Sequence, residues 1–115
     1  GNGGYHLKAM IVMNLYYRGM NGNARCFVEE MEKSGIADMV REEDGNERYE
    51  YFFSASDPET ALLIDAWRDQ KALDEHHRSR MMKEIAALRE KYDLHMTAER
   101  YLPDESTQDM IFIRR

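Results

Sequence analysis

Four stretches of the chain carry the pattern of hydrophobic positions that is typical of β-strands. The first, residues 8–17, is a continuous apolar run of strand length. Its odd and even positions are both apolar, so this strand must be covered on both faces. The other three are residues 48–54, in which aromatic side chains alternate, 62–67 and 95–102. The pattern therefore predicts a sheet of four strands.

Between these strands, apolar residues recur at the spacing of helices. Residues 24–31 place four apolar side chains at the i, i+3, i+4 and i+7 positions of an amphipathic helix. A short helix is expected at residues 36–40 and a longer one over residues 70–92, in which Ser79 marks a break. The order β-α-β-β-α-β predicts the ferredoxin-like α+β fold, a four-stranded antiparallel sheet with helices on one face.

The two faces of such a sheet are not covered equally. Residues 8–17 are apolar on both faces, and on the second strand Tyr49, Tyr51 and Phe53 alternate with Phe52. A face without helices would expose more apolar area than monomers usually do. We therefore expect a homodimer that packs sheet against sheet. One of Tyr49 and Tyr51 would then lie in the interface, and a cavity would lie between each sheet and its own helices.

The length of 115 residues fits one domain. We expect that domain to span residues 8–102, after a disordered lead-in at residues 1–7. Residues 103–115 form a C-terminal extension. Its apolar segment, residues 110–113, is expected to be either an added edge strand or an arm that contacts the other subunit.

Composition and charge exclude several classes of partner. The net charge is −6 and the charges of both signs are interspersed, so no basic stripe is available for nucleic acid. No apolar run approaches the ~18 residues that a membrane span requires. Cys26 is the single cysteine, which excludes an intramolecular disulfide. Because no secretion signal is recognisable, the cytoplasm is the expected compartment.

Residues 62–77, LLIDAWRDQKALDEHH, join a strand to a helix and carry the candidate chemistry. Trp67 ends the strand and His76 lies two turns into the helix, so both side chains can reach one pocket wall. His76 is a natural proton acceptor, because an unperturbed histidine pKa of ~6.5 leaves the ring neutral in the cell. Asn14 is the one polar residue inside the first strand, and a buried amide without partners costs roughly 1–3 kcal/mol.

Each candidate also has a purely structural interpretation. Trp67 is a large core residue whose N–H needs a partner in any case. His77 falls on the apolar side of its helix, where packing is the common role of a histidine. Adjacent histidines project about 100° apart on a helix, so His76 and His77 do not share a metal and we predict no metal site.

Residues 67–76, W-R-D-Q-K-A-L-D-E-H, preceded by D-G-N-E-R-Y-E-Y-F-F-S at residues 44–54, resemble the antibiotic biosynthesis monooxygenase family and, within it, the quinol monooxygenases. The similarity extends over residues 9–101. It implies a dimeric α/β barrel that oxidises quinols or polycyclic aromatic phenols with O2 and uses neither a metal nor a flavin. Related haem-degrading enzymes have an iron-binding histidine further along this helix. Ala86 and Ala87 stand there, so the resemblance implies no haem cofactor.

This resemblance, with the residue chemistry, implies two sets of site residues. The expected catalytic residues are His76, as the base that takes a phenolic proton, and Asn14 and Trp67, as hydrogen-bond donors to a developing oxyanion or peroxide. The expected substrate-binding residues are Tyr49, Tyr51 and His77.

Two other functions remain open on the sequence. The family is similar to isomerases of small phosphorylated carbonyl compounds, which would need a cation in the cavity, such as Arg48 or Arg100, to hold phosphate. The chain could also be a dimeric binding module without turnover. A cavity lined by apolar groups with Asn14, Trp67 and His76 would favour the oxygenase.

Overall fold

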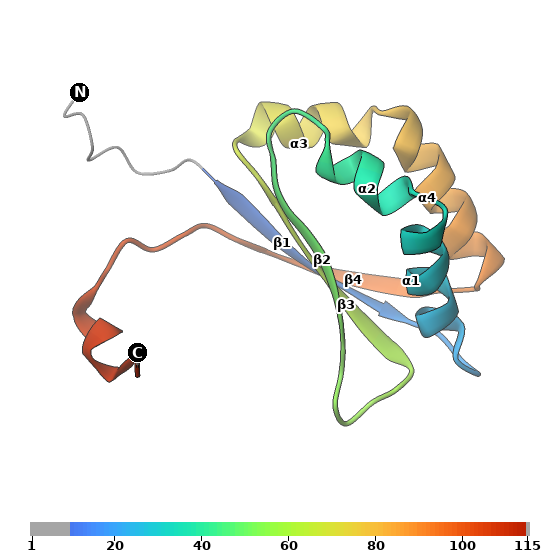
Figure 1. The fold of residues 1–115 in the computed structure, drawn as a ribbon, viewed down its shortest axis with the longest axis horizontal. Helices are drawn as coiled ribbons and strands as arrows, with labels where there is room; N and C mark the ends of the chain where they lie inside the picture. Colours follow the sequence, from blue (N-terminus) through green and yellow to red (C-terminus); the bar gives the residue numbers. More distant parts are fainter. Residues whose placement is uncertain (1–9, 115) are drawn as a thin grey trace.

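The computed structural model describes residues 10–114, so the lead-in predicted at residues 1–7 lies outside the described part (Figure 1). The elements follow in the order β1 (Ile11–Arg18), α1 (Asn23–Lys33), α2 (Ile36–Arg41), β2 (Asn46–Phe53), β3 (Thr60–Trp67), α3 (Gln70–His77), α4 (Arg80–Lys91) and β4 (His95–Tyr101). The ferredoxin-like α+β fold is confirmed, and the break predicted at Ser79 separates α3 from α4.

The four strands form one antiparallel sheet in the order β2-β3-β1-β4. All four helices lie on the same side of this sheet (Figure 1). We call the face toward the helices the inner face and the opposite face the outer face. In β1 the inner face carries Ile11, Met13, Leu15 and Tyr17, and in the paired strand β3 it carries Ala61, Leu63, Asp65 and Trp67.

The helices bury their apolar stripes on the inner face. The buried side chains of α1 are Ala24, Phe27, Val28 and Met31, at the predicted spacing. The ring of Phe27 packs against Tyr17 of β1 at a centroid distance of 5.0 Å. Helix α1 packs against β3 and α2 packs against β2, whereas α3 and α4 supply the helix residues that line the candidate site.

Tyr49 and Tyr51 of β2 both lie on the inner face, although one of them was expected at a subunit interface. Tyr49 is buried against the inner face, and Tyr51 packs edge-on against Phe27 of α1. The prediction that one of these tyrosines faces a subunit interface is therefore wrong. The sequence does not show which alternate positions of β2 face the helices, because β2 carries aromatic side chains on both faces.

Beyond β4 the chain runs away from the sheet and ends in a 3-10 helix, Gln108–Phe112 (Figure 1). The edge strand that we considered for this segment does not form. Ile111 and Phe112 are 80% and 81% exposed, which is unusual for large apolar side chains. The alternative, an arm that contacts a second subunit, stays a prediction. Among residues 10–114, no helix combines the length and apolar character that crossing a membrane would require.

Candidate functional site

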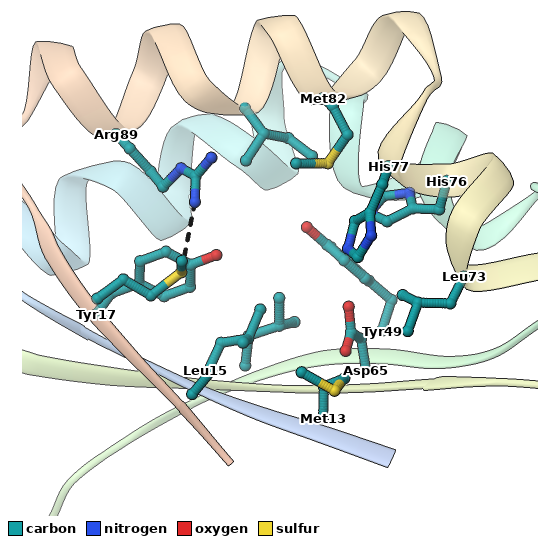
Figure 2. A pocket seen from close by; sticks show the side chains of 14 residues that line it. Met13, Leu15, Tyr17, Tyr49, Asp65, Leu73, His76, His77, Met82 and Arg89 are labelled. Carbon is teal, nitrogen blue, oxygen red and sulfur yellow. Dashed lines mark hydrogen bonds between the residues drawn. The ribbon is translucent and has the colours of Figure 1, made fainter. Parts of the chain in front are cut away.

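A cavity of about 190 Å³ lies between the inner face of the sheet and helices α3 and α4 (Figure 2). Its apolar wall comes from β1, β3, β4 and the two helices, whereas its polar groups come from β1, β2, β3, α3 and α4. The lining residues are Met13, Leu15, Tyr17, Tyr49, Leu63, Asp65, Leu73, His76, His77, Met82, Ile85, Arg89, Met96 and Ala98.

Local sequence explains how His76 reaches this wall. Trp67 ends β3, and two residues later the Asp69 carboxylate accepts a hydrogen bond from the Ala72 backbone N–H at 2.9 Å, which caps the start of α3. The helix then returns over the sheet and buries Ala72 and His76. The His76 ring stacks on the indole of Trp67 with centroids 4.5 Å apart. Trp67 is fully buried, so it supports His76 from behind and does not line the cavity.

His76 is held from its other side by Glu43. Its Nδ1 lies 2.9 Å from Glu43 Oε1. Glu43 comes from the turn before β2, and Gly45 in that turn has a φ of +85° and approaches α3 so closely that an added Cβ would overlap Ala72. Burial raises the pKa of Glu43 to about 7 and lowers the pKa of His76 to about 4. When Glu43 is ionised, the neutral His76 donates Nδ1–H to it and keeps Nε2 as an acceptor.

Asp65 is the buried carboxyl group of the cavity. It is 3% exposed and lies on the inner face of β3, with its carboxyl directed into the cavity (Figure 2). Burial raises the pKa of Asp65 to about 7, an effect that the nearby Trp67 indole only partly offsets. Among the described residues, Asp65 Oδ1 and Trp67 Nε1 have no hydrogen-bond partner. A buried acceptor without a partner is costly, so Asp65 calls for an explanation.

The predicted substrate-binding residues lie near this carboxyl group. Tyr49 lines the cavity, and its hydroxyl is 3.3 Å from the hydroxyl of Tyr51, which stands behind it. Burial raises the pKa of both tyrosines, so both remain neutral hydrogen-bonding groups. His77 also lines the cavity and is exposed on its other side. The fold thus brings Tyr49, His76 and His77 together in the cavity wall. Tyr51 contacts Tyr49 but does not line the cavity.

Asn14 is not brought together with these residues. It lies on the outer face of β1, opposite Ile64 of β3 and Glu99 of β4, and is partly exposed. The sheet itself separates Asn14 from the cavity. Our expectation that Asn14 and His76 would share one cavity is therefore not met within this subunit. The error has a simple cause, because a strand that is apolar on both faces gives no sign of which face meets the helices.

The cations considered for a phosphate site also lie elsewhere. Arg48 pairs with Glu50 on the surface at 3.1 Å, and Arg100 donates to the Gln70 side chain at 2.7 Å. Neither lines the cavity. The cation that does is Arg89 of α4, whose Nη1 lies 3.4 Å from the sulfur of Met96 (Figure 2). Arg89 and Asp65 lie at opposite ends of the cavity (Figure 2).

A second pocket, of about 380 Å³, lies on the far side of His76. His76 lines both spaces and therefore forms the wall between them. The other residues that line the second pocket are Met39, Glu43, Asp44, Ala72, Glu75, Ser79, Arg80 and Met81. In the part of the chain that is described, no three His, Cys, Asp or Glu side chains come together in a way that could hold a metal ion.

Sequence reasoning missed Asp65 and Glu43. For Asp65 a signal was present, because period-two alternation places it on the same strand face as Leu63 and Trp67, in a segment that we treated as simply apolar. For Glu43 no signal exists, since it stands among other charged residues of a turn. Only the contact between that turn and α3 reveals that one of these carboxyl groups is partly buried.

The fold is that of a ferredoxin-like protein with a cavity between its sheet and helices α3 and α4. The sequence model of the antibiotic biosynthesis monooxygenase family matches residues 10–88, and the chain therefore belongs to this family. Family membership assigns it to the monooxygenases. No curated protein sequence matches the chain.

Solved structures with the same fold include a cofactor-independent oxygenase, SnoaB from Streptomyces nogalater. It has 10% sequence identity and a TM-score of 0.72, over 88% of this chain and 99% of that one. A protein from Pseudomonas aeruginosa has 18% identity and a TM-score of 0.73, with coverage of 86% and 98%. A protein from Nitrosomonas europaea, whose name places it in the same family, has 18% identity and a TM-score of 0.75, with coverage of 88% and 96%. At these identities the likeness shows the fold.

Proposed function

We propose that this protein is a cofactor-independent monooxygenase that oxidises a single-ring quinol or related phenol with O2. The observation that carries the proposal is the cavity, an apolar space on the inner face whose polar wall holds His76 and Asp65. Such a space admits an electron-rich ring together with O2. In the net reaction, one oxygen atom enters the substrate and the other leaves as water. The quinol supplies the electrons and protons, so neither a metal nor a flavin is needed.

The size of the cavity favours a small substrate. A volume of about 190 Å³ is slightly larger than the ~150 Å³ apolar cavity that holds benzene in another protein. A single substituted ring fits this space, whereas a fused polycyclic phenol would have to displace lining side chains. We therefore expect rates to fall as the ring system grows.

The chemistry requires an acceptor for the phenolic proton and hydrogen bonds to the charge that develops on oxygen. His76 and Asp65 are the two candidate acceptors in the wall, and Tyr49 and His77 can bind the substrate oxygen atoms. Trp67 and Tyr51 act indirectly, because Trp67 contacts His76 and Tyr51 contacts Tyr49. Asn14 stays a candidate only if a partner subunit brings a second cavity to the outer face.

Oxygen consumption with hydroquinone, measured against autoxidation, tests this proposal. We expect uptake above the background for hydroquinone and less for naphthohydroquinone. We expect His76→Ala to lower the rate by about 100-fold, because it removes a hydrogen-bonding group from the cavity wall. The matched control is His95→Ala, since His95 is exposed on β4 and does not line the cavity.

The absence of uptake above autoxidation for every hydroquinone would contradict the proposal. If uptake occurs but His76→Ala and His95→Ala behave alike, the site is elsewhere. Binding of inorganic phosphate that is lost in Arg89→Gln would instead support the isomerase, because Arg89 is the cation at this cavity.

We also propose that the working form is a homodimer whose subunits meet through their outer faces. Val12 and Tyr16 of β1, Leu62 and Ile64 of β3 and Phe52 of β2 are only half-buried there, and no helix covers them. The exposed apolar 3-10 helix at the C-terminus could contact the partner in such a dimer. A cytoplasmic location remains a prediction, supported by the single cysteine.

A further inference from the structure

We propose that Asp65 binds the hydroxyl group of the substrate and takes its proton, which makes a neutral single-ring phenol the ligand class of the cavity. This inference rests on the proposed function for its catalytic part. It departs from the sequence-based expectation, in which His76 is the base. The carboxylate accepts the proton, the phenolic O–H bond breaks, and its electron pair stays on the substrate oxygen as a phenolate, which O2 then oxidises.

The first support is geometric. Asp65 is 3% exposed, its carboxyl points into the cavity (Figure 2), and its Oδ1 has no partner among the described residues. A buried carboxyl that served packing alone would be expected to have hydrogen-bond partners. A ligand hydroxyl supplies the missing donor. Because the surrounding wall contains Met13, Leu63 and Leu73, the ligand around that hydroxyl must be apolar.

The second support is the contrast with His76. The Nδ1 of His76 already contacts Glu43, whereas the carboxyl of Asp65 is paired with no charged group among the described residues and has the Trp67 indole beside it. Burial acts in opposite directions on the two groups, lowering the pKa of His76 to about 4 and raising that of Asp65 to about 7. Asp65 is therefore the stronger base, and its pKa suits proton transfer at cellular pH. His76, fixed by Glu43 and Trp67, is left to orient the bound ring and its oxygen atoms.

Other titratable groups near Asp65 must be considered before its pH dependence is tested. The groups that line the same cavity are Tyr17 on β1, Tyr49 on β2, His76 and His77 on α3 and Arg89 on α4. Burial raises the pKa of Tyr17 to about 12 and that of Tyr49 further, so both stay neutral, and Arg89 stays charged. Behind His76, burial also raises the pKa of Glu43 to about 7. Glu43 and the neighbouring His77 therefore both need control variants.

Calorimetric binding of phenol and fluorobenzene, which differ in the hydroxyl donor but little in size, tests the inference without turnover. We expect phenol to bind about tenfold more tightly at about pH 8 than at about pH 5.5, because a bond to an ionised acceptor is roughly twice as strong as a neutral one. Fluorobenzene should show no such gain. The gain should disappear in Asp65→Asn and persist in His77→Gln and Glu43→Gln.

A phenol gain that persists in Asp65→Asn, or an equal gain for fluorobenzene, would overturn the assignment of Asp65. In the oxygen-consumption assay, Asp65→Asn should lower kcat with hydroquinone by about 100-fold and abolish the rise of kcat/KM with pH around neutrality. If the kcat/KM of the Asp65→Asn variant still rises with pH, the role of Asp65 as the base is overturned. If the pH-dependent phenol gain is found but no quinol is oxidised, the phenol site stands and the proposed oxygenase fails.

Discussion

Odd-numbered and even-numbered residues of the same strands meet different surroundings in this molecule. On the inner face, Met13 and Asp65 meet helices α3 and α4 and enclose a cavity. On the outer face, Asn14 and Ile64 lie side by side on neighbouring strands with no helix above them. Both faces are largely apolar, so composition does not distinguish them. The difference is that helices cover the inner face, which encloses a buried carboxyl group, whereas no helix covers the outer face.

Under our two proposals, the inner face carries the chemistry and the outer face carries the association of two subunits. A buried carboxyl such as Asp65 is tolerable only where a ligand or a proton neutralises it. A flat apolar surface is tolerable in water only when it is small or covered by a partner. A substitution on the inner face should therefore affect the chemistry and leave association largely intact. A substitution on the outer face should do the reverse.

The largest expected effect is on association. Ile64→Glu introduces a carboxylate at the centre of the outer face, and its burial without a partner should weaken the dimer by roughly 4 kcal/mol, about a thousandfold in Kd. Sedimentation equilibrium measures this change. The control is Glu84→Gln, at an exposed position of α4, away from the outer face. A parent protein that is monomeric at high concentration would contradict the proposed role of the outer face.

The next effect is a pH dependence of stability that belongs to the inner face. Asp65 binds a proton more tightly in the folded protein, with a pKa of about 7, than in the unfolded chain, where the ordinary value is 3.8. The folded state therefore holds more protons between these values, and its stability falls as the pH rises through them. From about pH 5 to about pH 7 this loss amounts to about 2 kcal/mol.

Urea unfolding of the parent and of Asp65→Asn at the two pH values tests this expectation. The variant should lose about 2 kcal/mol less than the parent, because its amide does not titrate. Glu43 titrates in the same direction in both proteins, so its share cancels in the comparison. Equal losses in the parent and in Asp65→Asn would mean that burial does not raise the pKa of this carboxyl.

The smallest effect concerns the helix that covers the inner face. Asp69→Ala removes the carboxylate that accepts from the Ala72 N–H at the start of α3, and it should cost about 1 kcal/mol in thermal or urea unfolding. Oxygen consumption should change only moderately, since His76 keeps its contacts with Trp67 and Glu43. A loss of activity as large as that of His76→Ala, in a folded protein, would show that α3 needs this cap to position the site.

The sequence predicted the element order and the buried helix stripes well, because these depend on local periodicity. It did not predict which face of a strand meets the helices. Strands β1 and β2 are apolar or aromatic on both faces, so Asn14 was assigned to the cavity and one of Tyr49 and Tyr51 to an interface, and neither expectation holds for the subunit. Which face of such a strand meets the helices is decided by tertiary packing.

The candidate site was predicted only in part for a related reason. His76 and Trp67 were found because they stand in a recognisable strand-to-helix segment. Asp65 stands in the same segment, but its burial beneath α3 could not be weighed without the fold. The pairing of Glu43 with His76 joins residues far apart in the chain through a turn, and charged turns are exposed in most proteins.

The most direct test of the claim that the inner face encloses the ligand chamber uses the methionines of the chain. Carbon-13 labelling of their methyl groups allows a titration with phenol to be followed by NMR. Met13, Met82 and Met96 line the cavity, whereas Met39 and Met81 line the second pocket beyond His76. We predict that phenol shifts the first three signals and leaves the other two in place. Shifts of Met39 and Met81, with the three cavity methyl signals unmoved, would contradict it.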